Sequence, residues 1–442
     1  MIKKPELLAP AGDLEKLKMA VLYGADAVYI GGLNFSLRER ATNFDEAQMR
    51  EAIAFAHAHG VKVYVTVNIY AHNEHIAAMP EYLQKLADLQ ADALIISDPG
   101  VFALAKRTVP DMELHISTQA STTNYEAVEF WRQAGAARVI LAREVSLYDC
   151  GVISKHSPAD LEIFVHGAVC MSYSGRCLLS SFMTKRSGNL GDCAQPCRWQ
   201  YRLEEAKRPG SYFPIEEDKW GSYIFNSKDL CLIELLPEIL FRGVASLKIE
   251  GRMKSAYYVA NVVRVYRQAV DACWQAVQKY LADNNLTAEN CPTEIDFAKF
   301  KEEYFTVKEE WHEELQKISH RHYFTGFAVG KPNENGYIYD TTYSFRGYDF
   351  AGVVLASEDG RIKIQQRNHL ALGDEVEIIS PQEPVYKLRL RDIRDEDGNL
   401  REVLNHPKEI AWVECEKSFA PGSIIRRPIK DENLKEMNKI HD

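Results

Sequence analysis

The sequence predicts an α/β protein: a (β/α)8 TIM-like barrel with a cysteine-rich insertion, followed by a small all-β, barrel-like domain. Three observations lead to this prediction. Apolar, β-branched segments alternate with longer segments of helical period up to about residue 280. A long stretch with little periodicity then interrupts the last repeat. Beyond about residue 323, short strands separated by glycine turns replace the alternation.

Eight strands and their outer helices are expected in order along the chain. The strands are predicted at residues 6–9, 27–30, 61–67, 93–97, 113–117, 138–142, 161–165 and 244–249. Helices are predicted between them, including 13–23, 45–59, 77–90, 124–134 and 228–241, and a longer helix at 256–282. Gly24 and Gly135 stand where a helix turns back into a strand. Because no Gly-x-Gly-x-x-Gly follows the first strand, an open dinucleotide-binding sheet is disfavoured.

These elements predict four parts of the chain. The barrel takes residues 1–285 and contains the insertion at about 167–226. A helical linker follows at 286–322, then the β domain at 323–430 and a tail at 431–442.

Composition bounds the class of protein. The chain has 442 residues, 46% of them hydrophobic, and a formal net charge of -10. Its start has no apolar signal core, and no apolar run is long enough for a membrane span. We therefore expect a cytoplasmic protein without membrane association. The acidic balance disfavours a broad basic face for nucleic acid but leaves local RNA contact open.

Four of the nine cysteines cluster directly after the seventh strand, at Cys170, Cys177, Cys193 and Cys197. Barrel enzymes keep their chemistry at this end of the strands. An odd number of cysteines cannot pair fully, and the cytosol keeps thiols reduced, so the cluster predicts a metal site rather than disulfides. The spacing favours an iron-sulfur cluster. Structural zinc and inert buried thiols remain alternatives, and Cys231 is a possible substitute for one ligand.

Polar side chains at the predicted strand ends are further candidates for the site. The catalytic candidates are His166, Arg143, Glu144, Lys248 and Glu250, and the substrate-binding candidates are Arg38, Asn68, Gln119 and Arg252. The alternative for Arg143 with Glu144, and for Lys248 with Glu250, is that each is an ion pair that holds loops in place at the barrel mouth. For His166 the alternatives are a proton carrier or cluster neighbour and a purely structural histidine.

The β domain contains Tyr386-Lys387-Leu388-Arg389-Leu390-Arg391, in which alternation puts three cations on one strand face and the leucines on the other. Such a stripe suits a phosphate backbone, and a solvated strand face is the alternative. Protease motifs are missing from the sequence: it has no His-Glu-x-x-His and no Gly-x-Ser-x-Gly.

The run 162–170, Glu-Ile-Phe-Val-His-Gly-Ala-Val-Cys, with Gly175, Cys177, Leu179 and Ser180 after it, resembles the signature of the collagenase-like peptidase family of unassigned catalytic mechanism. Within that family, the length and the C-terminal β domain are similar to members that hydroxylate tRNA.

The resemblance implies a [4Fe-4S] enzyme that hydroxylates carbon 5 of wobble uridine 34 in tRNA, without molecular oxygen and with prephenate. It implies Cys170, Cys177 and Cys193 as cluster ligands and Cys197 as the fourth. Arg38, Arg143, Lys248 and Arg252 would then bind the small carboxylate co-substrate. The partners expected are tRNA and this co-substrate, with a partner protein or a second copy as a further possibility. A collagenase-like peptidase and a non-catalytic iron-sulfur scaffold are the competing functions.

Overall fold

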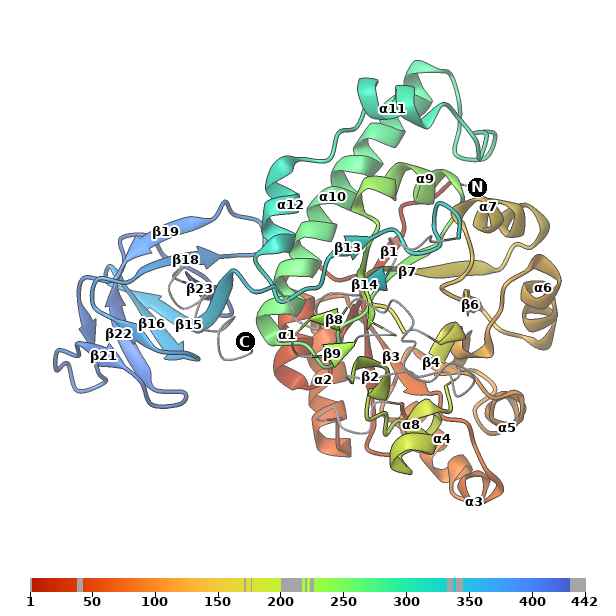
Figure 1. Ribbon diagram of the computed structural model, residues 1–442, viewed down its shortest axis with the longest axis horizontal. Helices are drawn as coiled ribbons and strands as arrows, with labels where there is room; N and C mark the ends of the chain where they lie inside the picture. Colours follow the sequence, from red (N-terminus) through yellow and green to blue (C-terminus); the bar gives the residue numbers. More distant parts are fainter. Residues whose placement is uncertain are drawn as a thin grey trace.

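A computed structural model of the protein describes residues 2–37, 43–170, 172–175, 177–199, 217–218, 221–222, 226–331, 337–338 and 345–429. Figure 1 shows two bodies, a large barrel surrounded by helices and a smaller β domain (blue) beside it. Arg38, one of the predicted substrate-binding residues, lies outside the described residues.

The eight predicted strands form a closed parallel barrel. They are β1 (Glu6–Pro10), β2 (Ala27–Gly31), β3 (Lys62–Val67), β4 (Ala93–Ile96), β5 (Glu113–Ile116), β6 (Arg138–Ile140), β7 (Asp160–Ala168) and β12 (Ser246–Ile249). Each strand pairs with its neighbour in parallel, and β12 pairs with both β1 and β7, which closes the ring. The predicted TIM-like fold is confirmed.

Helices surround this barrel on the outside (Figure 1). They are α1 (Leu14–Leu22), α2 (Glu46–Ala58), α3 (Asn73–Ile76), α4 (Met79–Asp88), α5 (Pro99–Thr108), α6 (Tyr125–Ala134), α7 (Leu147–His156), α9 (Leu236–Phe241) and α10 (Ala256–Asp283). Side chains of Asp13, Asp98 and Asn124 accept hydrogen bonds from the first turns of α1, α5 and α6. These N-caps fix where each helix starts after its strand. Within the described ranges, no helix has the length and apolar character needed to cross a membrane.

Two short strands extend the barrel sheet and correct the prediction. The range 228–241, predicted as one helix, begins with strand β11 (Asp229–Cys231), which runs antiparallel to β7. A short apolar run does not distinguish a strand from a helix by its period, and here the carboxyl end of β7 decides, because it continues past the residues that pair with β6. Strand β13 (Tyr323–Phe324) lies in the range predicted for the β domain but pairs with β11 instead.

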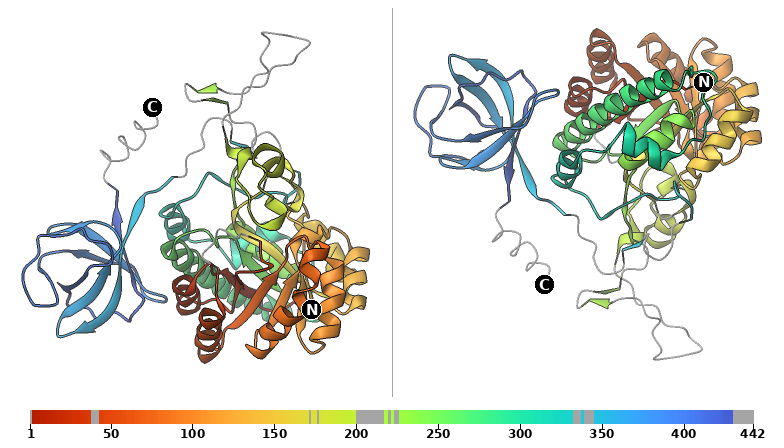
Figure 2. Two further views of the ribbon diagram at one scale, coloured as in Figure 1. Left: turned by 90° about the horizontal axis from the view of Figure 1, so that it is seen from below. Right: turned by 90° about the horizontal axis from the view of Figure 1, so that it is seen from above.

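The insertion after β7 contains mostly short 3-10 turns. They are η2 (Tyr173–Gly175), η3 (Gly188–Leu190) and η4 (Pro196–Arg198), with helix α8 (Leu179–Thr184) among them, followed by the small strands β8 (Glu217–Asp218), β9 (Gly221–Ser222) and β10 (Asn226–Ser227). Two further 3-10 turns lie at η1 (Thr118–Ala120) and η5 (Ile233–Leu235). In both views of Figure 2 the yellow-green insertion projects from the barrel, away from the β domain.

The linker contains α11 (Phe297–Glu303) and α12 (Glu309–Gln316), and β14 (Tyr337–Ile338) pairs back with β10. The β domain is one curled antiparallel sheet (Figure 2) with strand order β19-β18-β23-β15-β16-β22-β20. These strands are β15 (Tyr348–Glu358), β16 (Arg361–Gln366), β18 (Glu375–Ile379), β19 (Tyr386–Arg389), β20 (Ile393–Arg394), β22 (Ile410–Glu414) and β23 (Ile424–Pro428), and β17 (Leu370–Ala371) pairs with β21 (Val403–Leu404). As predicted, Lys387 and Arg389 on edge strand β19 and Arg391 just after it are exposed, while Leu390 is buried.

A buried ion-pair network joins the β domain to the barrel helices. The fully buried guanidinium of Arg426, on β23, contacts Glu314 of α12 at 2.6 Å and Glu377 of β18 at 2.7 Å. Tyr23, at the end of α1, donates a hydrogen bond of 2.9 Å to the Ile379 carbonyl. The two bodies are therefore held together by directed polar contacts as well as by apolar packing.

Candidate functional site

A cavity of about 460 Å³ lies at the carboxyl ends of the barrel strands, under the cysteine-containing insertion. All four clustered cysteines line it, and so do six of the predicted polar residues: Asn68, Gln119, Arg143, Lys248, Glu250 and Arg252. Two other candidates, His166 and Glu144, do not line it. This position is the one that barrel enzymes use for their active sites.

The turn from β7 into the cysteine segment depends on a glycine. Gly167 has φ +105°, and a Cβ placed there would lie 2.4 Å from the carbonyl oxygen of Glu250. Only glycine permits both this conformation and this close approach. The pairing of β7 with β12 also shifts here. Lys248 pairs with Phe164, but the next residue, Ile249, pairs with His166, so β7 contains one extra residue at this point. The bulge reverses the side on which the following residues of β7 point.

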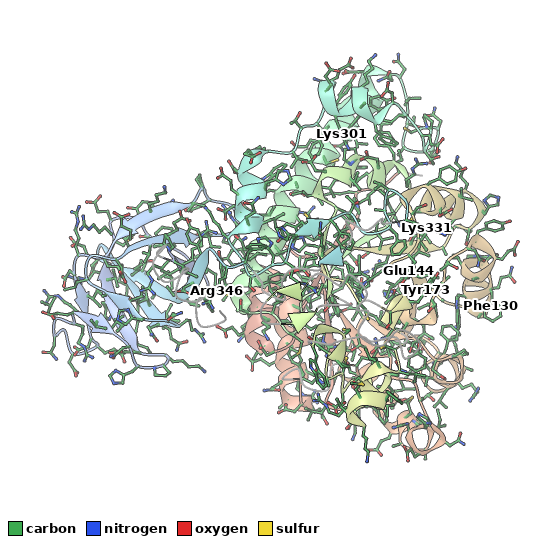
Figure 3. All side chains as sticks on the ribbon, viewed as in Figure 1. Phe130, Glu144, Tyr173, Lys301, Lys331 and Arg346 are labelled. Atoms are coloured by element: carbon green, nitrogen blue, oxygen red, sulfur yellow. The ribbon has the colours of Figure 1, made fainter. Side chains whose placement is uncertain are left out.

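Glu144 fixes the beginning of the insertion rather than facing the cavity. Its carboxylate accepts hydrogen bonds from the Ser174 amide at 2.8 Å and from the Ser174 hydroxyl at 2.6 Å. Ser174 has a positive φ of 42°, so these bonds hold a backbone turn that is unfavourable in isolation. Figure 3 shows Glu144 close to Tyr173, the residue before this turn. We therefore assign Glu144 to positioning the loop.

The four thiols suit ligation of an inorganic group. None of the nine cysteines forms a disulfide. The Cys177 sulfur accepts a hydrogen bond from the Leu179 amide at 3.3 Å, and the Cys193 sulfur accepts one from the Gln195 amide at 3.4 Å. Amide hydrogen bonds of this kind stabilise thiolates and tune the clusters that thiolates bind. Among the described residues, no three ligating side chains converge as they would on one metal ion. Four cysteines are the ligand number that a [4Fe-4S] cluster and structural zinc both use.

Cys231, the alternative fourth ligand, lies elsewhere. It belongs to strand β11, not to a helix as predicted, and it does not line the cavity. Its sulfur is 3.8 Å from the hydroxyl of Tyr266, and burial raises the pKa of its thiol to about 11. A neutral thiol in this setting favours packing over metal binding.

A buried chain of charges supports the cavity floor. The Lys248 ammonium donates to Glu162 at 2.8 Å and lies over the Tyr29 ring at 4.3 Å. Glu162 also accepts a hydrogen bond from Arg138 at 3.2 Å. Burial alone would raise the pKa of Glu162, but Lys248 and Arg138 outweigh it and hold that pKa below its usual range. Lys248 is thus a cation that the Glu162 carboxylate holds in place.

Arginines form much of the remaining polar wall. Arg143 stacks on the Phe164 ring at 4.1 Å and lies 3.6 Å from the Glu250 carboxylate. Arg252 donates to Asn43 at 2.6 Å and to the Leu37 carbonyl at 3.0 Å, so it ties down the chain after β2. Sequence reasoning missed Arg321, which lines the cavity from the linker.

Asp229, on β11, holds Arg321 through hydrogen bonds of 3.0 Å to Nε and 2.6 Å to Nη2. Paired contacts of this kind fix the plane of the guanidinium. The linker therefore contributes a rigid cation to the cavity wall.

Two amides face each other in the cavity. Asn68 accepts a hydrogen bond from the Leu37 amide at 3.1 Å and donates to the Gln119 side chain at 3.4 Å. Both side chains line the cavity. Side-chain amides carry a donor and an acceptor, and so does the edge of a nucleobase.

His166 lies outside the cavity, against the prediction that it is catalytic. Its buried ring packs among three tyrosines, Tyr258, Tyr266 and Tyr323, at centroid distances of 6.1, 5.4 and 5.3 Å. Neither ring nitrogen has a hydrogen-bond partner in the structure. Burial lowers the pKa of His166 from 6.5 to about 3, so the ring is neutral at physiological pH. The bulge in β7 explains why the residue faces the outer helices.

Replacing His166 by phenylalanine should make the protein less sensitive to acid. Because the folded protein resists protonation of this ring while the unfolded chain accepts it, His166 removes stability as pH falls from 6.5 towards 3. Between pH 8 and pH 5 the wild type should lose about 2 kcal/mol that His166→Phe retains. Urea unfolding at the two pH values measures this difference. Equal losses in both proteins would show that the ring titrates normally.

The chain is similar to known proteins along nearly its whole length. Residues 12–337 match peptidase family U32, and residues 346–426 match the peptidase family U32 C-terminal domain. The tRNA hydroxylation protein P1 of Bacillus subtilis is 40% identical over 427 residues, which cover 96% of this chain and 95% of the relative. The tRNA hydroxylation protein P of Escherichia coli is 36% identical and covers 86% of this chain and 87% of its own length. An uncharacterized protease of Methanocaldococcus jannaschii is 35% identical, and the match covers 86% of this chain and 88% of the relative. The chain therefore belongs to peptidase family U32.

Proposed function

We propose that this protein is a tRNA hydroxylase that forms 5-hydroxyuridine at wobble position 34. The observation that carries the proposal is that four cysteines, none of them in a disulfide, share one cavity with amides and fixed cations at the carboxyl end of the barrel. Relatives named tRNA hydroxylation proteins at 36% to 45% identity support the same substrate class. A volume of about 460 Å³ also suits one nucleobase together with a small co-substrate.

We propose a [4Fe-4S] cluster as the cofactor, held by Cys170, Cys177, Cys193 and Cys197. The amide hydrogen bonds to Cys177 and Cys193 favour thiolates at these positions. A bound cluster would supply one-electron chemistry beside the substrate.

The protein's own side chains would bind and orient the reactants. Asn68 and Gln119 offer amide groups to the uracil edge, whose N3–H and carbonyl oxygens need both an acceptor and donors. Arg143 and Lys248 offer positive charge to a carboxylated co-substrate, with prephenate as the proposed compound and no requirement for molecular oxygen. Glu250 and Glu162 keep these two cations in place.

The peptidase alternative has less support from the site. Among the described residues that line the cavity there is no histidine to act as a general base. The nearby Ser174 hydroxyl donates to Glu144 and lies in a loop turn, so its proton is already engaged. The findings that favour this activity are names: those of the peptidase family U32 models and that of one relative, an uncharacterized protease.

Complementation tests the proposed function. A strain whose own tRNA wobble hydroxylation genes are deleted should regain 5-hydroxyuridine-derived nucleosides when it expresses this chain, as measured by mass spectrometry of digested tRNA. The purified protein should also modify that tRNA anaerobically when prephenate is present. Cleavage of collagen-like peptides by iron-free protein, without any change in tRNA, would overturn the proposal in favour of a peptidase. No turnover in either assay would favour a scaffold.

A further inference from the structure

The cysteine segment carries large apolar side chains on its outer surface, around the cavity it covers. Leu178 is 74% exposed, Phe182 is 85% exposed and Tyr173 is 53% exposed, and Met183 and Trp199 are exposed as well. Met253, which follows β12 and lines the cavity, is also exposed. Elsewhere in the described residues, exposed apolar side chains of this size lie more scattered along the chain. Exposed apolar side chains that gather in one segment can mark an interaction site.

These residues lie at the edge of the cavity. Tyr173 stands between Ser172 and Ser174, and both of these line the cavity. Leu178 likewise stands between the lining residues Cys177 and Leu179.

Helix α8 connects the exposed side chains of the cysteine segment to the cysteines themselves. Phe182 follows Leu178 by one helical turn, and its amide donates to the Leu178 carbonyl at 2.9 Å, so the two side chains are neighbours on one face. The Ser180 hydroxyl of the same helix accepts a hydrogen bond from the Ala194 amide at 2.9 Å, next to Cys193. The exposed side chains of this segment are therefore close in sequence to residues that line the cavity.

We infer that Tyr173, Leu178, Phe182 and Trp199 form a stacking platform for the unpaired bases that flank the target uridine in a single-stranded RNA loop. The inference rests on the proposed function and adds how the substrate is held. A base can enter a cavity of this size only when it leaves its stack, and its neighbours then lose stacking partners. Exposed aromatic side chains replace those partners for any base, because every base has a π face.

The charge of the protein favours RNA held by stacking over RNA held mainly by its phosphates. The whole chain carries a formal net charge of -10, which opposes broad electrostatic attraction. Lys185, directly after α8, is exposed and can meet a single phosphate. Arg186 beside it is paired with Asp192 at 2.8 Å. Most of the binding should therefore come from contacts that salt does not screen.

Binding of an anticodon stem-loop RNA to the full-length, anaerobically purified protein tests this inference. Tyr173→Ala and Phe182→Ala should each weaken binding by roughly 5- to 150-fold in fluorescence anisotropy. Tyr173→Phe should restore wild-type affinity, because stacking needs the ring and not the hydroxyl. Phe130→Ala is the matched control: Phe130 is 63% exposed on α6 and does not line the cavity (Figure 3), so its loss should leave affinity unchanged.

Two further readouts separate the possible results. Iron content equal to that of wild type shows that the cysteine segment remains folded in each variant. The loss in affinity should persist at high salt, whereas loss of a phosphate-binding cation would shrink as salt rises.

If the alanine variants bind the stem-loop as tightly as wild type while wild type still hydroxylates tRNA, the platform is refuted and the proposed function stands. If the same substitutions abolish association with another protein but not with RNA, the surface is a protein-binding site and the inference is again overturned. If wild type neither binds nor modifies the RNA, the proposed function fails with it.

Discussion

Cys170→Ala should purify with little or no cluster iron and should leave tRNA unhydroxylated. Three thiolates that remain around a cavity of about 460 Å³ would leave one iron of a cubane exposed and labile. Iron and sulfide analysis of anaerobically purified protein, with the visible absorbance of the cluster, measures the first effect. Mass spectrometry of tRNA from the complemented strain measures the second. Full iron content in this variant would remove Cys170 from the ligand set.

The fourth ligand can be identified by the same measurements on a matched pair of variants. Cys197→Ala should lose the cluster as Cys170→Ala does, because Cys197 lines the cavity. Cys231→Ala should keep its iron, because Cys231 packs against Tyr266 outside the cavity. The reverse outcome, with iron lost only in Cys231→Ala, would require the insertion to rearrange around the cluster.

Arg426→Met should destabilise the folded protein by about 3–5 kcal/mol, since it removes the buried guanidinium that two carboxylates share and leaves them the more exposed Lys317. Burial alone would raise the pKa of Glu314, but Arg426 outweighs it and keeps that pKa below its usual range. Without the guanidinium, Glu314 should take up a proton more readily. The deficit should therefore be largest near neutral pH and should shrink as pH falls through the raised pKa of Glu314.

Urea unfolding of Arg426→Met from pH 8 to pH 4 measures both expectations. Arg50→Met is a suitable control, because Arg50 pairs with Glu46 on the exposed face of α2 and should change stability by less than about 1 kcal/mol. A similar small change in Arg426→Met would mean that the carboxylates reach other partners when the arginine is absent.

The barrel was predictable because its signals are local. Strands such as β3 and β4 are short β-branched runs, and the caps and glycines that separate them from helices stand at fixed offsets. The β domain was predictable for the same reason, since alternation at the end of β19 leaves Arg389 outside and the next residue, Leu390, inside. The cysteine cluster was predictable from its spacing alone.

The features that sequence reasoning missed depend on long-range pairing. His166 was expected to face the site, and a bulge between β7 and β12 turns it outward. Strand β11 forms because the carboxyl end of β7 continues past its pairing with β6, and no local pattern in the sequence indicates this. Arg321 stands in a polar linker with no motif around it, and only the fold brings it to Asp229. The ion pair between Lys248 and Glu162 likewise joins residues far apart in sequence.

The contact between Arg321 and Asp229 means that the barrel of this molecule is not autonomous. A polypeptide truncated after α10 would retain all eight barrel strands and all four clustered cysteines, yet Asp229 would be left as a buried anion without its Arg321 partner. The cavity wall would also lose the guanidinium of Arg321. A shorter protein of this architecture would therefore need another cation beside Asp229.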